Sequence, residues 1–393
     1  MLKAMGIDPG TKTFDLVVID GNHVVWEGSI ETVKVAEEPN SLIDKVMEAG
    51  EIDIIAGPSG YGVPVTSNLE IVDPYRFALE VLLLTRREDL RFGIEKGELG
   101  IKVYEAITKI VVELWRKRLP VYYIPSCILL PTIPLHRKIN RLDMGTADKM
   151  AVAVLGVYDQ SRRYDLDYHK VNFVLVELGF GYNAVIGVQH GRIVDGLGGT
   201  LVPTGFLTIG PIDAELAVLG HRWLRSDVFH GGVAEICGTI DIDEILERYQ
   251  KNERPYSIAI AAMLENIERS VRCIAASLKD VREILLSGRY SKHEMLRNLI
   301  IEKLYEIAPV RNLGGIPGSK ISKEAAQGYA IVGDGLHGGF FSNLVKHMKI
   351  DLSRGTVLDW VFHPRLKNAK KWLLRAYKGS VKNPKLVKFK YAF

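Results

Sequence analysis

The sequence predicts an α/β protein built from two similar domains. Its 393 residues exceed the usual size of one hydrophobic core. An acidic residue followed by a glycine ends a β-rich run at Asp8 and Gly10, and the same pattern returns at Glu177 and Gly179. Strand and helix patterns alternate through the rest of the first half, as in a mixed sheet covered by helices.

The first acid-glycine loop lies in residues 5–13, between two β-rich runs. In a tight strand-turn-strand connection, backbone N–H groups can face a phosphate while the acid faces a metal ion. The spacing matches neither the Walker loop nor the dinucleotide fingerprint, which both open a helix. Glycine and aspartate also serve turn geometry alone, so this loop by itself predicts a hairpin and not yet a site.

The second loop, in residues 173–181, repeats the first together with its flanking runs. The run that follows it turns at His190 and Gly191, as the corresponding run in the first copy turns at Gly21 and Asn22. A self-similar pattern of this kind is the signature of an internal repeat. We therefore expect duplicated domains, each giving one loop to the same polyphosphate.

Three later segments add to this pattern. Two helices rich in small residues are predicted at 147–157 and 323–335, one after each repeat, and small residues would let their backbones come close. Between them, residues 283–291 predict a buried strand that stops at Ser287 and Gly288. A glycine there leaves room for a flat purine and its sugar.

Taken together, these motifs resemble the actin-like ATPase superfamily, which includes acetate kinases, sugar kinases and Hsp70 chaperones. More narrowly, the whole chain is similar to an archaeal family of predicted butyrate kinases. The resemblance implies duplicated RNase H-like domains at residues 1–150 and 151–334, with residues 335–393 packing back on the first, and an interdomain cleft that binds Mg-ATP. It also implies that the two small-residue helices cross at a hinge about which nucleotide closes the domains.

The resemblance also implies residues for the nucleotide. They are Asp8 for Mg²⁺ and, for ATP, Gly10, Thr11, Lys12, Glu177, Gly179, Gly181, Gly288 and Arg289. Two positions depart from the superfamily, which more often has Asp where this chain has Glu177 and a second glycine where it has Arg289.

The segment before the helix at 147–157 holds the candidate catalytic residues. Asp148 is placed to act as a general base, and Arg137 and Arg141 could neutralise a transferring phosphoryl group. An acid in the first turn also suits the helix dipole without any catalytic role. A carboxylate acceptor would be ionised at pH 7 and would need no base.

Three classes of function stay open at this point. The first is a small-molecule kinase, whose acceptor is a short-chain carboxylate by resemblance or alternatively a sugar or other hydroxyl compound. The second is an ATPase that acts as a partner-coupled switch. The third is a nucleic-acid-associated protein that uses the basic C-terminal segment.

That C-terminal segment, residues 361–393, holds ten Lys and Arg residues and no acid. Its aromatic residues Trp372, Tyr377, Phe389, Tyr391 and Phe393 would suit stacking on nucleic acid. The alternative, which we favour, is a helix and arm packed on the body of the protein or on a second subunit of a homodimer.

Cysteine content and hydropathy indicate in which cellular compartment the protein is expected. Three cysteines, far apart, indicate neither a disulfide framework nor a zinc site. The chain begins with a predicted strand, which leaves no room for a signal peptide. No apolar run of membrane-spanning length is free of prolines or charges. We therefore expect a cytoplasmic protein that does not enter a membrane.

Overall fold

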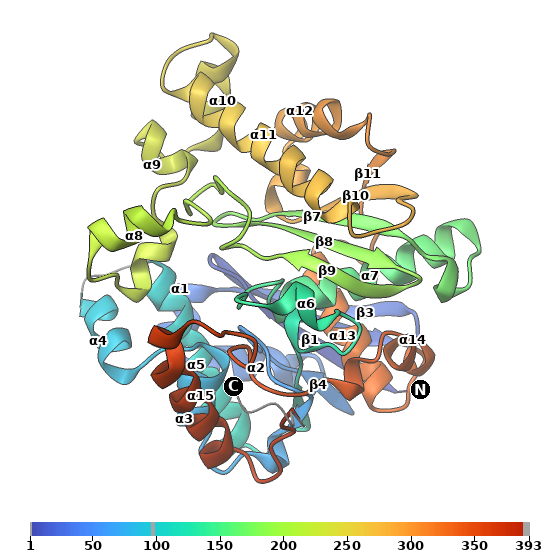
Figure 1. Cartoon of the computed structure of the whole chain (residues 1–393). Helices are drawn as coiled ribbons and strands as arrows, with labels where there is room; N and C mark the ends of the chain where they lie inside the picture. The colour runs from blue at the N-terminus through green and yellow to red at the C-terminus, as the bar shows by residue number, and fades with distance from the viewer. Residues whose placement is uncertain (1, 96–98, 388–393) are drawn as a thin grey trace. The chain divides into compact units, whose positions relative to one another are not determined.

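The computed structural model describes residues 2–95 and 99–387, and the chain forms two compact units (Figure 1). The first unit comprises Met1–Tyr158 and Gly315–Phe393, and the second comprises Asp159–Gly314. The unit boundaries thus fall at 158 and 314, whereas the sequence predicts 150 and 334. The difference arises because the first turns of α7 (Ala147–Tyr164) and all of α13 (Glu324–Leu336) belong to the first unit.

The first unit is built on a six-stranded sheet in the order β3-β2-β1-β4-β6-β5. Strands β1, β2 and β3 form an antiparallel meander, β4 and β6 continue parallel to β1, and β5 is antiparallel to β6. The bounds are Lys3–Pro9 for β1, Thr13–Asp20 for β2, His23–Glu31 for β3, Ile54–Ala56 for β4, Thr66–Ser67 for β5 and Val121–Tyr123 for β6.

Helices of the first unit pack on this sheet, and α13 lies directly on β1 (Figure 1). A Cβ added at Gly6 of β1 would overlap the carbonyl oxygen of Ala326 in α13, so the two backbones touch. Besides α7 and α13, the helices are α1 (Thr32–Glu37), α2 (Asn40–Glu48), α3 (Pro74–Arg76), α4 (Arg87–Glu95), α5 (Leu99–Arg116), α6 (Leu135–Lys138), α14 (Ser342–His347) and α15 (Lys367–Ser380).

The second unit has a five-stranded sheet in the order β11-β10-β7-β8-β9. Its strands are β7 (Phe173–Leu178), β8 (Asn183–Gln189), β9 (Arg192–Leu197), β10 (Glu283–Ser287) and β11 (Val310–Asn312). Its helices are α8 (Ala214–Gly220), α9 (Val233–Cys237), α10 (Ile242–Gln250), α11 (Tyr256–Ala275) and α12 (Glu294–Leu304). An apolar core that includes Val174, Val176, Ile260 and Leu264 joins β7 to α11.

The two sheets confirm the predicted duplication. In each unit an antiparallel meander of three strands is followed by strands that run parallel to the first strand of the meander. The register of the middle strand shifts at Val18 in the first unit and at Gly187 in the second. Both shifts come ten residues after the acid of the loop, Asp8 or Glu177. Even a local irregularity is therefore repeated.

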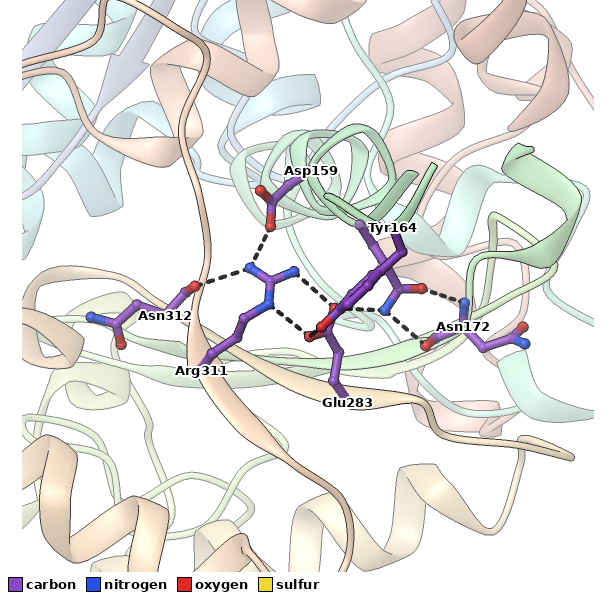
Figure 2. A network of polar contacts seen from close by, with 7 residues as sticks. Asp159, Tyr164, Asn172, Glu283, Arg311 and Asn312 are labelled. Carbon is purple, nitrogen blue, oxygen red and sulfur yellow. Dashed lines mark hydrogen bonds and ion pairs between the residues drawn. The ribbon is translucent and has the colours of Figure 1, made fainter. Parts of the chain in front are cut away.

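A buried network of ion pairs and hydrogen bonds joins α7 to strands β10 and β11 of the second unit (Figure 2). The guanidinium of Arg311 in β11 donates to both carboxylate oxygens of Glu283 in β10, at 2.6 and 2.8 Å, and to Asp159 in α7 at 2.5 Å. The amide of Gln160 and the hydroxyl of Tyr164 also donate to Glu283. The network ties the end of α7 to the two strands beside it.

The basic C-terminal segment contains α15, whose residues Leu373, Ala376 and Tyr377 are buried within the first unit. Tyr377 is therefore not exposed for stacking on a base, while the ring of Trp372 lies 5.5 Å from the guanidinium of Arg86. Phe389, Tyr391 and Phe393 lie outside the described residues. Among the helices that the structure describes, none combines the length and apolarity of a membrane span.

Candidate active site

The first acid-glycine loop is a tight turn between β1 and β2. The amide of Gly10 donates to the carbonyl oxygens of Asp8 at 3.2 Å and Thr13 at 3.0 Å. Thr32 binds the same turn. Its hydroxyl donates to the carbonyl of Gly10 at 2.7 Å, and its backbone amide donates to the carbonyl of Lys12 at 3.0 Å. The amide of Gly10 is therefore already hydrogen-bonded within the turn. Thr11 and Lys12 form the outer part of the turn.

Asp8 is buried at the end of β1 and faces Asp15 across the strand pair. The ammonium of Lys323, the residue just before α13, forms an ion pair with Asp15 and lies 3.9 Å from Oδ2 of Asp8. It also donates to the hydroxyl of Thr13 at 3.0 Å. A Cβ at Gly10 would stand 2.7 Å from this ammonium and 2.7 Å from the backbone carbonyl oxygen of Thr13, and the fixed carbonyl favours glycine here.

The pKa values of Asp8 and Asp148, the two acids that the sequence singles out, are shifted in opposite directions. Burial raises the pKa of Asp8 to about 7; Lys323 opposes this rise, and Asp148 and Asp15 add to it. Burial also acts to raise the pKa of Asp148, but the charge of Lys149 and hydrogen bonds from Lys149 and Thr146 outweigh it and lower this pKa. Asp148 is therefore held in its ionised form, whereas Asp8 is easily neutralised.

The residues at this loop suit magnesium better than a metal that needs a protein cage. Within residues 2–95 and 99–387, no three or more His, Cys, Asp and Glu side chains are grouped so as to hold a metal ion. Mg²⁺ is usually held by one or two carboxylates, with water and substrate phosphates completing its shell. Asp8 and Asp15 already share one cation, the ammonium of Lys323, so this pair fits such a partial site.

The loops after β4 and β6 are joined to the segment that carries Asp148. The hydroxyl of Ser59 donates to the carbonyl of Gly57 at 2.8 Å and accepts from the amide of Ile124 at 2.9 Å. The amide of Ala147 donates to the carbonyl of Gly60 at 3.1 Å. Carboxyl ends of parallel strands are the usual place for ligands in such sheets, and Asp148 follows directly after this junction.

Arg137 and Arg141 lie before that segment, in α6 and in the turn after it, and both are half-buried. The turn is anchored by the amide of Asn140, which donates to the carbonyl of Trp360 at 2.9 Å. The largest effects of charge on Asp8 come from Lys323 and Asp148, not from these arginines. Their part in phosphoryl transfer stays a prediction.

In the second unit, the fold brings together the two segments predicted to bind nucleotide. Ser287 of β10 is the register partner of Glu177 in β7. The next residue, Gly288, has φ of +87°, and a Cβ there would stand 2.6 Å from the carbonyl of Leu178 and 2.8 Å from the carboxylate of Glu177. The acid-glycine loop and the end of the predicted adenosine strand are therefore in direct contact, which requires glycine at 288.

The neighbours of these residues are fixed by backbone bonds and aromatic packing. The amide of Gly179 donates to the carbonyl of Tyr182 at 2.9 Å, and the carbonyl of Gly181 accepts from Leu207 at 3.1 Å. Arg289 is exposed, while the next residue, Tyr290, is buried with its ring 5.0 Å from that of Phe206.

A family model matches residues 6–363, which is most of the chain. The chain belongs to the DUF1464 family. This family is described as "Protein of unknown function (DUF1464)".

Two curated relatives of this DUF1464 protein are butyrate kinases. "Probable butyrate kinase 2" of Caldanaerobacter subterraneus subsp. tengcongensis is 23% identical over 348 residues, covering 79% of this chain and 92% of the relative. "Butyrate kinase 1" of Clostridium acetobutylicum is 20% identical over 355 residues, covering 80% and 93%.

Among solved structures, a propionate kinase from Francisella tularensis matches with a TM-score of 0.55 at 13% identity, covering 84% of this chain and 98% of that one. This likeness shows that the DUF1464 protein has the two-domain actin-like ATPase fold, as predicted.

Sequence reasoning missed Asp15 and Lys323. Asp15 had a local signal, because it is a lone charge inside the apolar run of β2 and strand residues buried on both faces are rarely ionised. Lys323 had no local signal, because its partner Thr13 lies 310 positions away in the sequence.

Proposed function

We propose that this DUF1464 protein is an ATP-dependent kinase whose acceptor is a short-chain carboxylate. The observation that carries the proposal is the buried Asp8, paired with Asp15 on a strand-turn-strand loop, in a fold shared with a propionate kinase. The two butyrate kinases, matched over 92% and 93% of their lengths, favour a carboxylate acceptor.

We assign to the nucleotide the residues that the sequence predicts for it. Asp8 holds Mg²⁺, directly or through water, and Thr11 and Lys12 contact the outer phosphates, with Gly10 allowing their close approach. Bound Mg²⁺ would neutralise phosphate charge during transfer. In the second unit the residues assigned to phosphate and adenosine are Glu177, Gly179, Gly181, Gly288 and Arg289.

The state of Asp148 favours a carboxylate over a hydroxyl acceptor. A general base works best when its pKa lies near the operating pH, and the pKa of Asp148 is lowered instead. One carboxylate oxygen of Asp148 accepts from Thr146 and the other from Lys149 at 2.6 Å. Asp148 is thus a poor base for a sugar hydroxyl, whereas a carboxylate needs none.

The proposed reaction forms one bond and breaks one. A carboxylate oxygen of the acceptor attacks the γ-phosphorus of ATP, and the bond from that phosphorus to the β,γ-bridging oxygen breaks with its electron pair leaving on ADP. The products are an acyl phosphate and ADP, and no proton is transferred. Arg137 and Arg141 are assigned to neutralise the transferring group.

The test is Mg-ATP turnover in the presence of acetate, propionate, butyrate or a panel of sugars, with ADP release as the readout. Hydroxylamine is added to trap any acyl phosphate as a hydroxamate. We expect ADP release that depends on a short carboxylate and yields hydroxamate. In the Asp148→Asn protein this turnover should change little through proton transfer, because no base is required.

Other outcomes would contradict the proposal. Sugar-dependent ADP release without hydroxamate, nearly abolished by Asp148→Asn, would show a hydroxyl kinase. Slow ADP release that no acceptor stimulates would show a partner-coupled ATPase. Stimulation by RNA alone would show the nucleic-acid-associated alternative.

A further inference from the structure

Asp8 and Asp15 present two carboxylates at one point of the sheet. They are cross-strand partners in the antiparallel register of β1 and β2, and each side chain is 7% exposed. Like charges directly opposite one another destabilise a strand pair, and burial strengthens their repulsion. A cation beside the two acids would relieve this repulsion and let both stay ionised.

Lys323 supplies that cation. Its ammonium pairs with Asp15, lies 3.9 Å from Asp8 and donates to the hydroxyl of Thr13 and, at 3.3 Å, to its carbonyl. The side chain of Lys323 is 27% exposed, so solvent reaches part of it. When both acids are ionised, two carboxylates and one ammonium carry a net charge of about −1, which attracts a further cation.

The backbone that carries Lys323 is held by Glu27 in β3. The carboxylate of Glu27 accepts from the amides of Lys320 at 2.9 Å, Ile321 at 3.1 Å and Ser322 at 3.0 Å. It also accepts from the hydroxyls of Ser319 at 3.0 Å and Ser322 at 2.5 Å. With the segment before it fixed at five points, Lys323 moves chiefly through its flexible four-carbon stem.

We propose that Lys323 is an exchangeable counter-cation: its ammonium turns from Asp8 and Asp15 to an outer phosphate when a nucleotide binds, and Mg²⁺ that arrives with the nucleotide takes its place beside the two acids. The proposal rests on the proposed function. An ammonium and a divalent ion repel each other at such short range, and a phosphate near both offsets this repulsion. Lys323 therefore disfavours the metal alone and favours the metal with nucleotide.

This coupling predicts effects of opposite sign in one variant. Lys323→Met removes the competing cation, so metal alone should bind more tightly. It also removes a phosphate contact, so ATP without metal should bind more weakly. Because coupling between two ligands is reciprocal, the factor by which ATP raises metal affinity should fall as well.

The experiment measures binding of Mn²⁺ alone, of ATP in EDTA and of Mg-ATP to the full-length protein by calorimetry. We expect Lys323→Met to tighten Mn²⁺ binding and weaken metal-free ATP binding, each by about tenfold, as for a partly exposed charge at this range. Lys323→Arg should keep Mn²⁺ binding weak. The control is Lys320→Met, because Lys320 is exposed and lies on the same Glu27-held segment.

Equal Mn²⁺ affinity in wild type and Lys323→Met, with ATP binding intact, would overturn the proposal that Lys323 exchanges with the metal. Lys323 would then form only a structural ion pair with Asp15. Failure of the wild-type protein to bind Mg-ATP would instead contradict the proposed function. If Lys323→Met does not fold, Lys323→Gln makes the same charge change and can still donate to Thr13, and the same two outcomes apply to it.

Discussion

Gly328 of α13 lies against the backbone of Ala151 in α7, and a Cβ at Gly328 would overlap the carbonyl oxygen of Ala151. Both residues belong to the first unit. The contact confirms that the two small-residue helices touch through their backbones. On its other side, α13 touches β1 at Gly6, so this helix has no room to shift away from an added side chain.

Gly328→Ala should therefore destabilise the protein by about 1–3 kcal/mol, the usual range for overpacking. Gly333→Ala in the same helix is the control, since its Cβ would stand 3.4 Å from that of Ala56. There, the gain in helix propensity, up to about 1 kcal/mol, should offset the tighter contact. Urea unfolding measures both, and equal effects would show that the close contact carries no energetic weight.

Asp8→Asn should leave the protein folded and abolish its Mg-dependent nucleotide binding. The pKa of Asp8 is raised by burial, so replacing its carboxylate by a neutral amide of the same shape removes a charge that is costly to bury. Turnover should fall on the order of a hundredfold to a thousandfold, as when a group that stabilises developing charge is lost.

Calorimetry with Mg-ATP and thermal unfolding separate binding from folding in this variant. Asp44→Asn, at an exposed position of α2 in the same unit, is the control and should match the wild type. Unchanged Mg-ATP affinity in Asp8→Asn would remove Asp8 from the metal site.

The Glu27 contact should give stability that depends on pH. Partial burial would raise the pKa of Glu27, but hydrogen bonds from Ser322, Lys320 and Ile321 lower it from 4.5 to about 2. A lowered acid pKa stabilises the folded state above the unfolded pKa, and this contribution is lost as pH falls from about 4.5 toward 2.

The free energy of unfolding of wild type and Glu27→Gln should thus differ most above pH 5 and converge as the pH falls. Urea titrations at pH 6, 4 and 3 measure this difference. Glu37→Gln, at an exposed position of α1, should show no such convergence. A difference that stays constant with pH would mean that the charge of Glu27 contributes nothing to the contact.

Arg311→Ala should destabilise the protein by about 3–5 kcal/mol, because it leaves two buried carboxylates without their cation. The side chains of Glu283 and Asp159 are only 3% and 4% exposed. Arg311→Lys should restore part of the loss, since an ammonium keeps the charge but not the paired geometry.

The control for this prediction is Arg269→Ala, which breaks the exposed pair of Arg269 and Glu265 on α11. Exposed pairs contribute at most about 1 kcal/mol. Chemical unfolding followed by circular dichroism measures all three variants. A loss in Arg311→Ala no greater than that in Arg269→Ala would show that the network adds little to stability.

The sequence by itself determined the duplicated α/β architecture. Hydrophobic periodicity and turn residues are local properties, so the runs around Asp8 and Glu177 were enough to predict two matching meanders. The same local patterns predicted α13 and β10 with bounds close to those observed, and they predicted where α7 begins.

Only the tertiary structure decided which charges meet at the loop. Lys323 reaches Thr13 across 310 positions because α13 packs on β1, and no local pattern encodes such a contact. The opposite pKa shifts of Asp8 and Asp148 were equally out of reach, because burial and partners set them. The sequence therefore placed the acids on their strand and helix, whereas long-range packing determined their neighbours and so their charge.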